Sequence, residues 1–335
     1  MHNPLISILI PFKNTAEFLP ECLQSIINQT YTNWELLIVD DGSTDESFKI
    51  VEDFIIKDSR IQLFKNNGFG IINALRLAFS KSKGELITRM DSDDIMTYNK
   101  IEVLSNNLLK YGKQHVAIGQ VTYFSKSGVG DGYTKYETWI NNLTLNGTNY
   151  SEIYKECVIP SPCWMIYRED LINADAFNHN RYPEDYDLAF RFYKNSYTCI
   201  PCSSVLHQWR DYATRTSRTD AHYTHDYLLD LKLHYFLKLD YDNSRLLTLW
   251  GAGDKGKSIA KTLIEKEVPF RWICDNPKKI GRDIYGQELK PFSFLKQVKN
   301  PQSIITVANT EAQKQIKNYL IKLELQSMSD YFFFC

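Results

Sequence analysis

Two groups of carboxylates stand directly after apolar segments in the N-terminal part of the chain. Asp40 and Asp41 end the stretch WELLIVDD, and Asp91, Asp93 and Asp94 follow GELITRM. Like charges this close repel one another. The groups are therefore either solvated turns and helix N-caps, for which Asp is a usual residue, or a site for something positive. Aspartates at i and i+2 across a tight turn can both face a divalent cation, and such a cation also binds a diphosphate.

The segments that must position these acids alternate between strand and helix patterns. The apolar runs ISILIPF, WELLIVD, IQLF and GELITRM are separated by stretches with apolar residues at helical spacing, and Ser43 or Thr44 is the expected N-cap of the second of these helices. This alternation predicts an α/β fold with a mostly parallel sheet flanked by helices. Ligands bind beyond the carboxyl ends of such strands, so both acidic groups are expected at one edge, which favours a site.

Composition limits the classes of partner and compartment. The 335 residues predict two domains, and a net charge of −1 gives no support for nucleic acid as the main partner, so we expect none. The chain has no apolar run of roughly 18–20 residues and its start lacks the features of a secretory signal, so we expect a cytoplasmic protein. Attachment to the inner face of the membrane stays open. Cys199 and Cys202 form a lone CxxC among seven cysteines, which favours packed, reduced thiols over a zinc site.

The pattern becomes irregular between about residues 113 and 217 and regular again near the C-terminus. A helix is expected at residues 185–194, and another at 222–239 that links or packs. A new strand, loop and helix begin at Leu246. We therefore expect an N-terminal domain at 1–220, a helical linker at 221–244 and a smaller α/β domain at 245–335.

The C-terminal domain opens with a glycine-rich loop. GAGDKG supplies Gly251, Gly253 and Gly256 between a predicted strand and helix, and Asp275 ends the next strand 19 residues after the last glycine. This is the Rossmann arrangement, with an acid placed for a ribose hydroxyl. The segment is long enough for one mononucleotide-binding half, so we do not expect NAD chemistry. Nucleotide or nucleotide-sugar binding and a packing or partner-docking module both remain open.

Four motifs in order carry a resemblance to a known family. The opening ISILIPFKNTAEFLPECLQSIINQTYTNWELLIVDDGSTDES resembles that of family-two glycosyltransferases of the GT-A fold, and MDSDD matches their DxD motif. RYPEDYDLAFRF resembles their ED-containing segment, and VLHQWRDYATRTSRTD their Trp-Arg stretch. The match covers roughly residues 3–220. The C-terminal segment resembles the small Rossmann-like domains attached to some bacterial glycosyltransferases and sugar-acyltransferases.

The resemblance implies an inverting, metal-dependent glycosyltransferase of the hexosyl or N-acetylhexosaminyl type. It would move a sugar from a nucleotide sugar, UDP-linked in our expectation, to a hydroxyl of a saccharide or lipid-linked saccharide in bacterial surface polysaccharide or glycoconjugate synthesis. Asp93 would ligate Mn²⁺ or Mg²⁺, and Asp185 would be the general base. Nucleoside and diphosphate contacts are implied for Pro11, Asn14, Asp41, Asp91 and Arg210, and sugar or acceptor contacts for Glu184, Trp209 and Trp164.

Some of these residues have other interpretations. Asp185 also fits a helix N-cap, and Trp164 also fits simple packing. The related Trp-Arg segment usually has a His at the position of Tyr212, which leaves open any His contribution to metal or phosphate binding. One rival function is a non-catalytic nucleotide-sugar sensor that uses the C-terminal domain. A nucleotidyltransferase is disfavoured because IPFKNTAEF has no glycine to hold a triphosphate. Homo-oligomerisation is left open.

Overall fold

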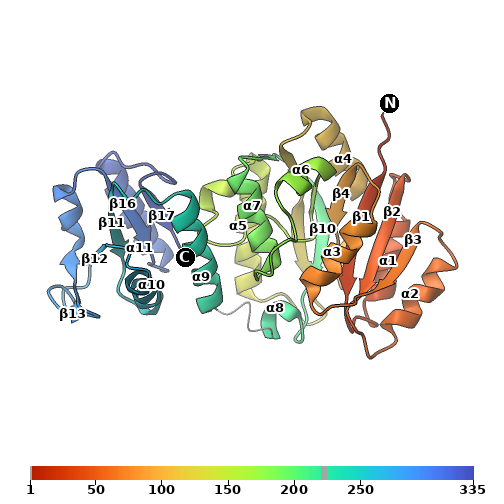
Figure 1. The fold of residues 1–335 in the computed structure, drawn as a ribbon, viewed down its shortest axis with the longest axis horizontal. Helices are drawn as coiled ribbons and strands as arrows, with labels where there is room; N and C mark the ends of the chain where they lie inside the picture. The colour runs from red at the N-terminus through yellow and green to blue at the C-terminus, as the bar shows by residue number, and fades with distance from the viewer. Residues whose placement is uncertain (1, 220–224) are drawn as a thin grey trace. The chain divides into compact units, whose positions relative to one another are not determined.

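The computed structural model describes residues 2–219 and 225–335, which form two compact units (Figure 1). The first unit comprises Met1–Asn149 and Val158–Arg215, and the second comprises Tyr150–Cys157 and Thr216–Cys335. Each unit is described by itself.

The first unit is built on a mostly parallel sheet with the strand order β3-β2-β1-β4-β8-β6-β9. Strand β8 runs antiparallel to β4 and β6. A smaller sheet has the order β5-β10-β7. The strands are β1 (Ile6–Phe12), β2 (Trp34–Asp40), β3 (Ile61–Lys65), β4 (Leu86–Arg89), β5 (Ile95–Met96), β6 (His115–Ile118), β7 (Gln120–Phe124), β8 (Trp164–Tyr167), β9 (Thr198–Ile200) and β10 (Val205–Arg210).

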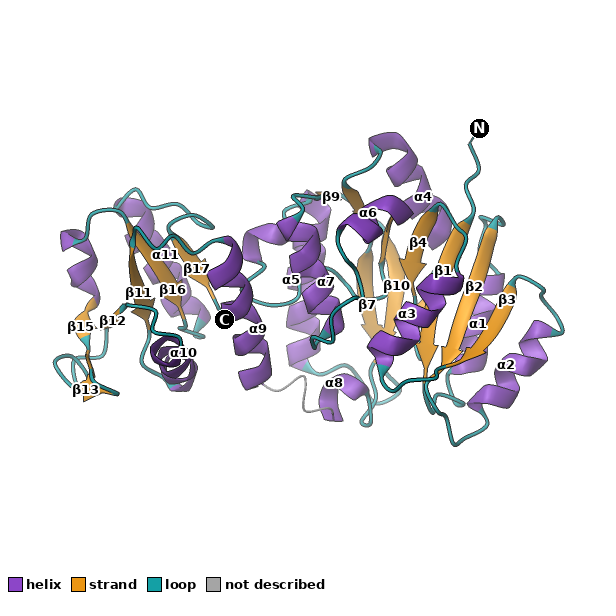
Figure 2. Cartoon of the chain, viewed as in Figure 1, coloured by secondary structure: helices purple, strands orange, loops and turns teal. Residues whose placement is uncertain are grey.

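Helices cover both faces of this sheet. The direction of strand addition reverses after β3, so right-handed crossovers place α3 on the face opposite α1 and α2. In Figure 2, α3 crosses the front of the sheet and α1 lies behind it. The helices are α1 (Leu19–Ile27), α2 (Ser47–Ile55), α3 (Ile71–Lys81), α4 (Lys100–Tyr111), α5 (Asp131–Asn146), α6 (Arg168–Asn173) and α7 (Glu184–Lys194). A 3₁₀ turn, η1 (Asn149–Glu152), begins at the last residue before the chain passes into the second unit.

The strand register brings the acidic segments to one edge of the sheet. Every residue of β1 and β2 is buried, as expected for parallel strands covered on both faces. Phe12 pairs with Asp40 across β1 and β2, and the Met90 amide, just after β4, donates to the Leu9 carbonyl at 3.0 Å. The carboxyl ends of β1, β2 and β4 therefore lie side by side, and the predicted common edge for the two acidic groups is confirmed.

The second unit contains a parallel sheet with the strand order β15-β12-β11-β16-β17. Its strands are β11 (Leu246–Trp250), β12 (Arg271–Cys274), β15 (Lys290–Pro291), β16 (Pro301–Ile305) and β17 (Tyr331–Phe333), with a β13 (Asp283–Ile284) and β14 (Gln287–Glu288) hairpin. Its helices are α8 (Thr216–Thr219), α9 (His225–Leu239), α10 (Asp254–Glu265), η3 (Phe292–Gln297) and α11 (Thr310–Lys322).

The division into units differs from the predicted boundaries at two places. Helix α9, expected in a linker, belongs to the second unit, and so does the segment Tyr150–Cys157. The reason is aromatic packing: the Tyr154 ring stacks on Phe334 with centroids 5.3 Å apart and meets Phe236 of α9 edge-on at 5.9 Å. A short stretch far from the C-terminal part of the sequence thus completes its core.

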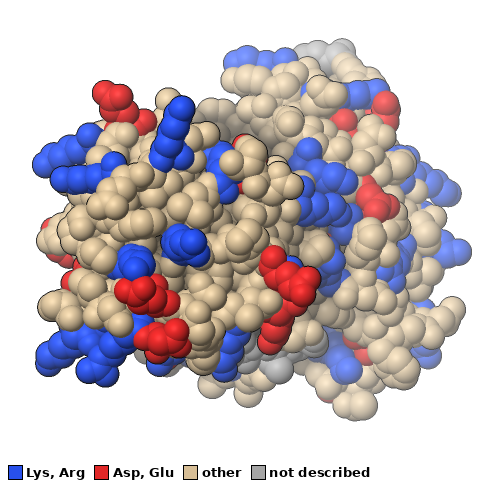
Figure 3. Space-filling view, turned by 60° about the vertical axis from the view of Figure 1, so that its left-hand side comes forward, with Lys and Arg blue, Asp and Glu red and all other residues tan. Residues whose placement is uncertain are grey.

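Surface charge is mixed, in keeping with the small net charge. Lysine and arginine side chains are interspersed with acidic ones on the face shown in Figure 3. Within residues 2–219 and 225–335, the helices are too short or too polar to span a bilayer.

Candidate active site

The turn after β4 contains aspartates in two different environments. Asp94 is fully buried and accepts hydrogen bonds from the Arg210 amide at 2.8 Å and from His207 Nε2 at 3.0 Å. Burial and the adjacent Lys100 ammonium, 3.3 Å from His207 Nδ1, lower the pKa of His207, so the imidazole is neutral and its Nε2–H donates to Asp94. Asp94 therefore fixes the turn to β10 and is not available to a ligand.

Asp93 is only partly buried and has one carboxylate oxygen engaged. The Tyr212 hydroxyl donates to Asp93 Oδ2 at 2.8 Å, and the Tyr212 ring packs on Phe18 with centroids 4.6 Å apart. Burial and then the negative charges of Asp94 and Asp91 raise the pKa of Asp93 to about 7. A carboxylate whose ionised form is disfavoured in this way is one that a cation would stabilise.

Arg215 is a charged residue beside the acidic turn that the sequence pattern did not single out. Burial alone would lower the pKa of Arg215, but the negative charges of Asp94, Asp93 and Asp91, with Tyr123, outweigh it and raise that pKa. The guanidinium lies 5.8 Å from the Tyr123 ring centroid. A cation of the chain itself thus faces the acidic turn. In the sequence, Arg215 is marked only by its position within the Trp-Arg stretch.

Arg89 joins the acidic turn to the start of α7. Its guanidinium is 4% exposed and contacts Asp91 Oδ1 at 3.0 Å and Glu184 Oε1 at 2.9 Å. Strand β4 and helix α7 are distant in sequence, and this bridge brings their acids into one site. Because Glu184 is buried against Arg89, its carboxylate is committed to that ion pair.

Asp185 is the second residue of α7, so the N-cap interpretation is wrong. Pro183 occupies the cap position, and Asp185 Oδ1 accepts the Tyr186 amide at 2.8 Å. Burial and the charge of Glu184 raise the pKa of Asp185 to about 7, while Arg89 opposes this rise. A carboxyl with a pKa near neutrality suits a general base at physiological pH.

The expected nucleoside-contacting residues lie at the carboxyl ends of β1 and β2. Pro11 is in β1, and Asn14 has a left-handed backbone (φ 52°) with Oδ1 accepting the Thr44 amide at 2.8 Å. Asp41 accepts the Gly70 amide at 3.0 Å and the Asn66 side-chain amide at 2.6 Å. These bonds hold Asp41 against the loop between β3 and α3.

The Trp-Arg pair is packed into the wall of the site. Arg210 donates to the Asp93 carbonyl at 2.8 Å, pairs with Glu21 at 2.6 Å and lies over the Phe124 ring. Trp209 is 5% exposed, with its ring 4.9 Å from that of Tyr123. In this structure both side chains serve mainly to brace the turn.

Trp164 is a core residue in β8. It is 1% exposed and packs edge-on against Phe192 at 6.0 Å. The packing interpretation fits this burial, and Trp164 has no surface to offer a sugar. Cys199 and Cys202 are also buried, and both are free thiols. Among the described residues, His, Cys, Asp and Glu form no group of three or more that could hold a metal ion.

The glycine loop of the second unit has the local geometry that its motif predicts. It joins β11 to α10, and Gly251 has φ 117°, where a Cβ would meet Thr306 Oγ1 at 2.6 Å. A Cβ on Gly256 would meet the Gly251 carbonyl at 2.0 Å, whereas Gly253 faces open space and Asp275 is exposed. The close contacts explain two of the glycines by packing alone. A nucleotide at this loop stays a prediction.

Residues 7–174 match the family model "Glycosyl transferase family 2". The chain belongs to this family. It is 30% identical over 225 residues to glycosyltransferase GlyG of Streptococcus pneumoniae, covering 65% of this chain and 74% of GlyG. It is also 30% identical over 220 residues to the Escherichia coli UDP-Glc:alpha-D-GlcNAc-diphosphoundecaprenol beta-1,3-glucosyltransferase WfgD, covering 63% of this chain and 78% of WfgD. It spans between 25% and 44% of the length of three further relatives.

Solved structures confirm the GT-A glycosyltransferase fold. S. aureus TarS 1-349 in complex with UDP-GlcNAc aligns with a TM-score of 0.55 at 17% identity, over 77% of this chain and 71% of that one. Mannosyltransferase PcManGT from Pyrobaculum calidifontis in complex with GDP-Man and Mn²⁺ aligns with a TM-score of 0.52 at 18% identity, over 71% of this chain and 64% of that one. The protein is thus a glycosyltransferase, as its motifs predicted.

Proposed function

We propose that this glycosyltransferase is an inverting, metal-dependent enzyme that transfers a hexose or N-acetylhexosamine from a UDP-sugar to a saccharide hydroxyl. The observation that carries the proposal is the Arg89 bridge, which holds the acidic turn at Asp91 and the Glu184–Asp185 pair in one site. The acidic turn supplies groups for a nucleotide diphosphate with its cation, and the Glu184–Asp185 pair supplies a base for an acceptor.

Asp93 fits a divalent cation in the manner typical of Mg²⁺ and Mn²⁺. Such ions are bound through one or two carboxylates, with substrate phosphates and water completing the shell. The raised pKa of Asp93 and the lack of a three-residue ligand cluster among the described residues both fit this mode. Bound there with the donor, the cation would stabilise charge on the leaving diphosphate, and Arg215 faces the same charge.

Asp185 would take the proton of the acceptor hydroxyl during a single in-line displacement. Glu184 is paired with Arg89 and is therefore not the expected nucleophile; we assign it to orient the acceptor. With Asp185 as the base and no second carboxylate assigned as nucleophile, the arrangement supports inversion rather than a covalent intermediate. We assign the base and ribose pocket to Pro11, Asn14, Asp41 and Asp91.

The acceptor is proposed from chemistry and from the relatives. WfgD is named for a diphosphoundecaprenol-linked acceptor, and we propose a saccharide or lipid-linked saccharide of bacterial surface polysaccharide or glycoconjugate synthesis here. The enzyme would then act at the inner face of the membrane. The family match favours catalysis over a non-catalytic sensor.

A thermal-shift screen of nucleotide sugars with and without Mn²⁺ tests the donor assignment. We expect one UDP-sugar to raise the melting temperature only with Mn²⁺, and Asp93→Ala to abolish that increase. Asp53→Ala, an exposed position on α2, serves as the control. A metal-dependent shift that survives in Asp93→Ala would refute the ligand assignment.

A further inference from the structure

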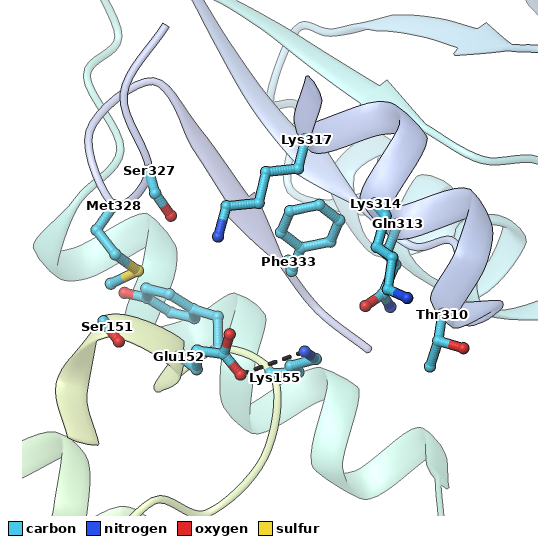
Figure 4. Close-up of a pocket in the computed structure, with 11 residues that line it drawn as sticks. Ser151, Glu152, Lys155, Thr310, Gln313, Lys314, Lys317, Ser327, Met328 and Phe333 are labelled. Carbon is cyan, nitrogen blue, oxygen red and sulfur yellow. Dashed lines mark hydrogen bonds and ion pairs between the residues drawn. The ribbon is translucent and has the colours of Figure 1, made fainter. Parts of the chain in front are cut away.

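We propose that the second unit carries a binding pocket for a phosphorylated sugar. A pocket of about 250 Å³ opens between the segment from η1 to Lys155 and helix α11, and its wall includes Ser151, Lys155, Thr310, Lys314, Lys317 and Phe333 (Figure 4). All of these residues belong to the second unit. The described lining residues include none from the Gly251–Gly256 loop, so this site is separate from the glycine motif.

The charge of the lining selects an anion. Lys314 and Lys317 are three residues apart on α11 and therefore share one face, while Lys155 lies on the opposite wall. Glu152 is the one acidic side chain among the described lining residues, and it already pairs with Lys155 at 3.2 Å. A phosphate monoester carries about −1.5 to −2 charges at pH 7, which matches the remaining positive charge.

Figure 4 shows Lys317 extending across the pocket between Phe333 and the turn at Met328. Its ammonium group lies over the space that a ligand would occupy. Lys314 pairs with Glu311 at 3.5 Å, but both side chains are more than 60% exposed, so the pair costs little to open.

A buried cation adds to the positive potential of this wall. Lys232 of α9 is 4% exposed, and its ammonium donates to the Lys155 carbonyl at 2.8 Å. Its charge lies directly behind the segment that carries Lys155. Charge in a poorly solvated position is weakly screened and acts on the pocket more strongly than a surface charge would.

The remaining lining fits a monosaccharide. Phe333 and Met328 offer apolar surface for the C–H face of a sugar ring, and the hydroxyls of Ser151, Thr310 and Ser327 can bond its hydroxyl groups. The volume lies just below the roughly 300–1,000 Å³ of common ligand pockets. It suits one sugar and one phosphate rather than a complete nucleotide sugar.

Two sources present a sugar with a phosphate on it: a free sugar phosphate, which is a monoester, and the head group of a polyprenyl-phosphate-linked sugar, which is a diester with one negative charge. Calorimetric titration of the full chain with glucose 1-phosphate tests the first, with neutral glucose as the comparison. EDTA in the buffer removes divalent cations, so the Asp93 site does not contribute. Flotation with phosphatidylcholine vesicles, with and without a polyprenyl-phosphate-linked glucose, tests the second.

The variants are Lys317→Gln and Lys314→Gln, with Lys322→Gln as a matched control on the exposed last turn of α11. We expect about tenfold weaker binding for each pocket variant, as for a lost hydrogen bond to a charged group, and no change for the control. Binding of either probe with this pattern supports the site and identifies the source. The proposed pocket is overturned if both probes fail to bind or if glucose binds equally well. It is also overturned if the pocket variants keep wild-type affinity. The acceptor site proposed for the first unit could also bind a lipid-linked sugar, but binding there would not be weakened by Lys317→Gln or Lys314→Gln.

Discussion

Aspartates of a single turn differ in what they can do because their neighbours differ. Asp94 is fully buried and its oxygens are taken by His207 and the Arg210 amide. Asp93 keeps a partly exposed carboxylate whose other oxygen accepts the Tyr212 hydroxyl. The repulsion among the carboxylates of this turn is thus reduced by the hydrogen bonds to Asp94 and by the positive charge of Arg215.

The Tyr212 hydroxyl donates to Asp93 at 2.8 Å, and we expect this bond to orient the proposed metal ligand. Removing a hydrogen bond to a metal ligand typically costs about 10- to 100-fold in metal affinity. Tyr212→Phe should therefore raise the Mn²⁺ concentration for half-maximal activity by at least about tenfold, with kcat recovered at saturating Mn²⁺. Tyr98→Phe, at an exposed tyrosine, is the control. An unchanged Mn²⁺ dependence would mean that this hydrogen bond does not support the metal site.

Asp185 should make stability depend on pH in a direction set by its raised pKa. The pKa is about 7 in the folded chain against 3.8 for the ordinary group, so ionisation destabilises the fold. This cost is absent below the unfolded pKa, grows as pH rises and is complete above about pH 7. Asp185→Asn should therefore be more stable than wild type, by an amount that grows by about 1 kcal/mol per pH unit between about pH 5 and 7.

Urea unfolding of both proteins across this pH range measures the difference. Asp53→Asn, an exposed position on α2, is the matched control and should show no trend. A wild-type and Asp185→Asn difference that stays constant with pH would show that Asp185 is not perturbed in the folded chain.

At the scale of elements, the site depends on the connection between β4 and α7. Arg89→Met leaves the buried Glu184 without its ion-pair partner, and loss of one member of a buried pair costs about 3–5 kcal/mol. We expect that loss in the free energy of unfolding, and we expect Arg89→Met/Glu184→Gln to recover most of it. If the double variant is as unstable as the single one, Arg89 stabilises the fold by packing and not through Glu184.

The order of elements in the first unit was predictable because strand and helix periods alternate clearly. The side-chain contacts within turns were harder to predict. The expected N-cap at Ser43 or Thr44 is wrong, because α2 begins at Ser47 and Ser43 Oγ instead accepts the Asn14 amide at 3.1 Å. Trp164 shows the same limit, since a tryptophan next to a predicted site can equally be a core residue. Arg215 was missed because one arginine in a polar loop carries no periodic signal.

At the scale of the whole molecule, the domain limits depend on contacts between distant segments. Tyr150–Cys157 interrupts the first unit in sequence but packs with the second through Tyr154. A linear boundary could not have been predicted correctly, because local composition does not reveal that a short stretch completes another core. The proposed pocket is built on this same segment, at Ser151 and Lys155.

The most direct test of the central claim, that the acidic turn and Asp185 form one catalytic site, is UDP release from a UDP-sugar with Mn²⁺ and a saccharide acceptor. Wild type should release UDP in an acceptor-dependent manner and form an inverted product. Asp185→Asn should bind the donor as wild type does and lose about 10²- to 10⁴-fold in turnover. Turnover by Asp185→Asn at the wild-type rate would contradict the account.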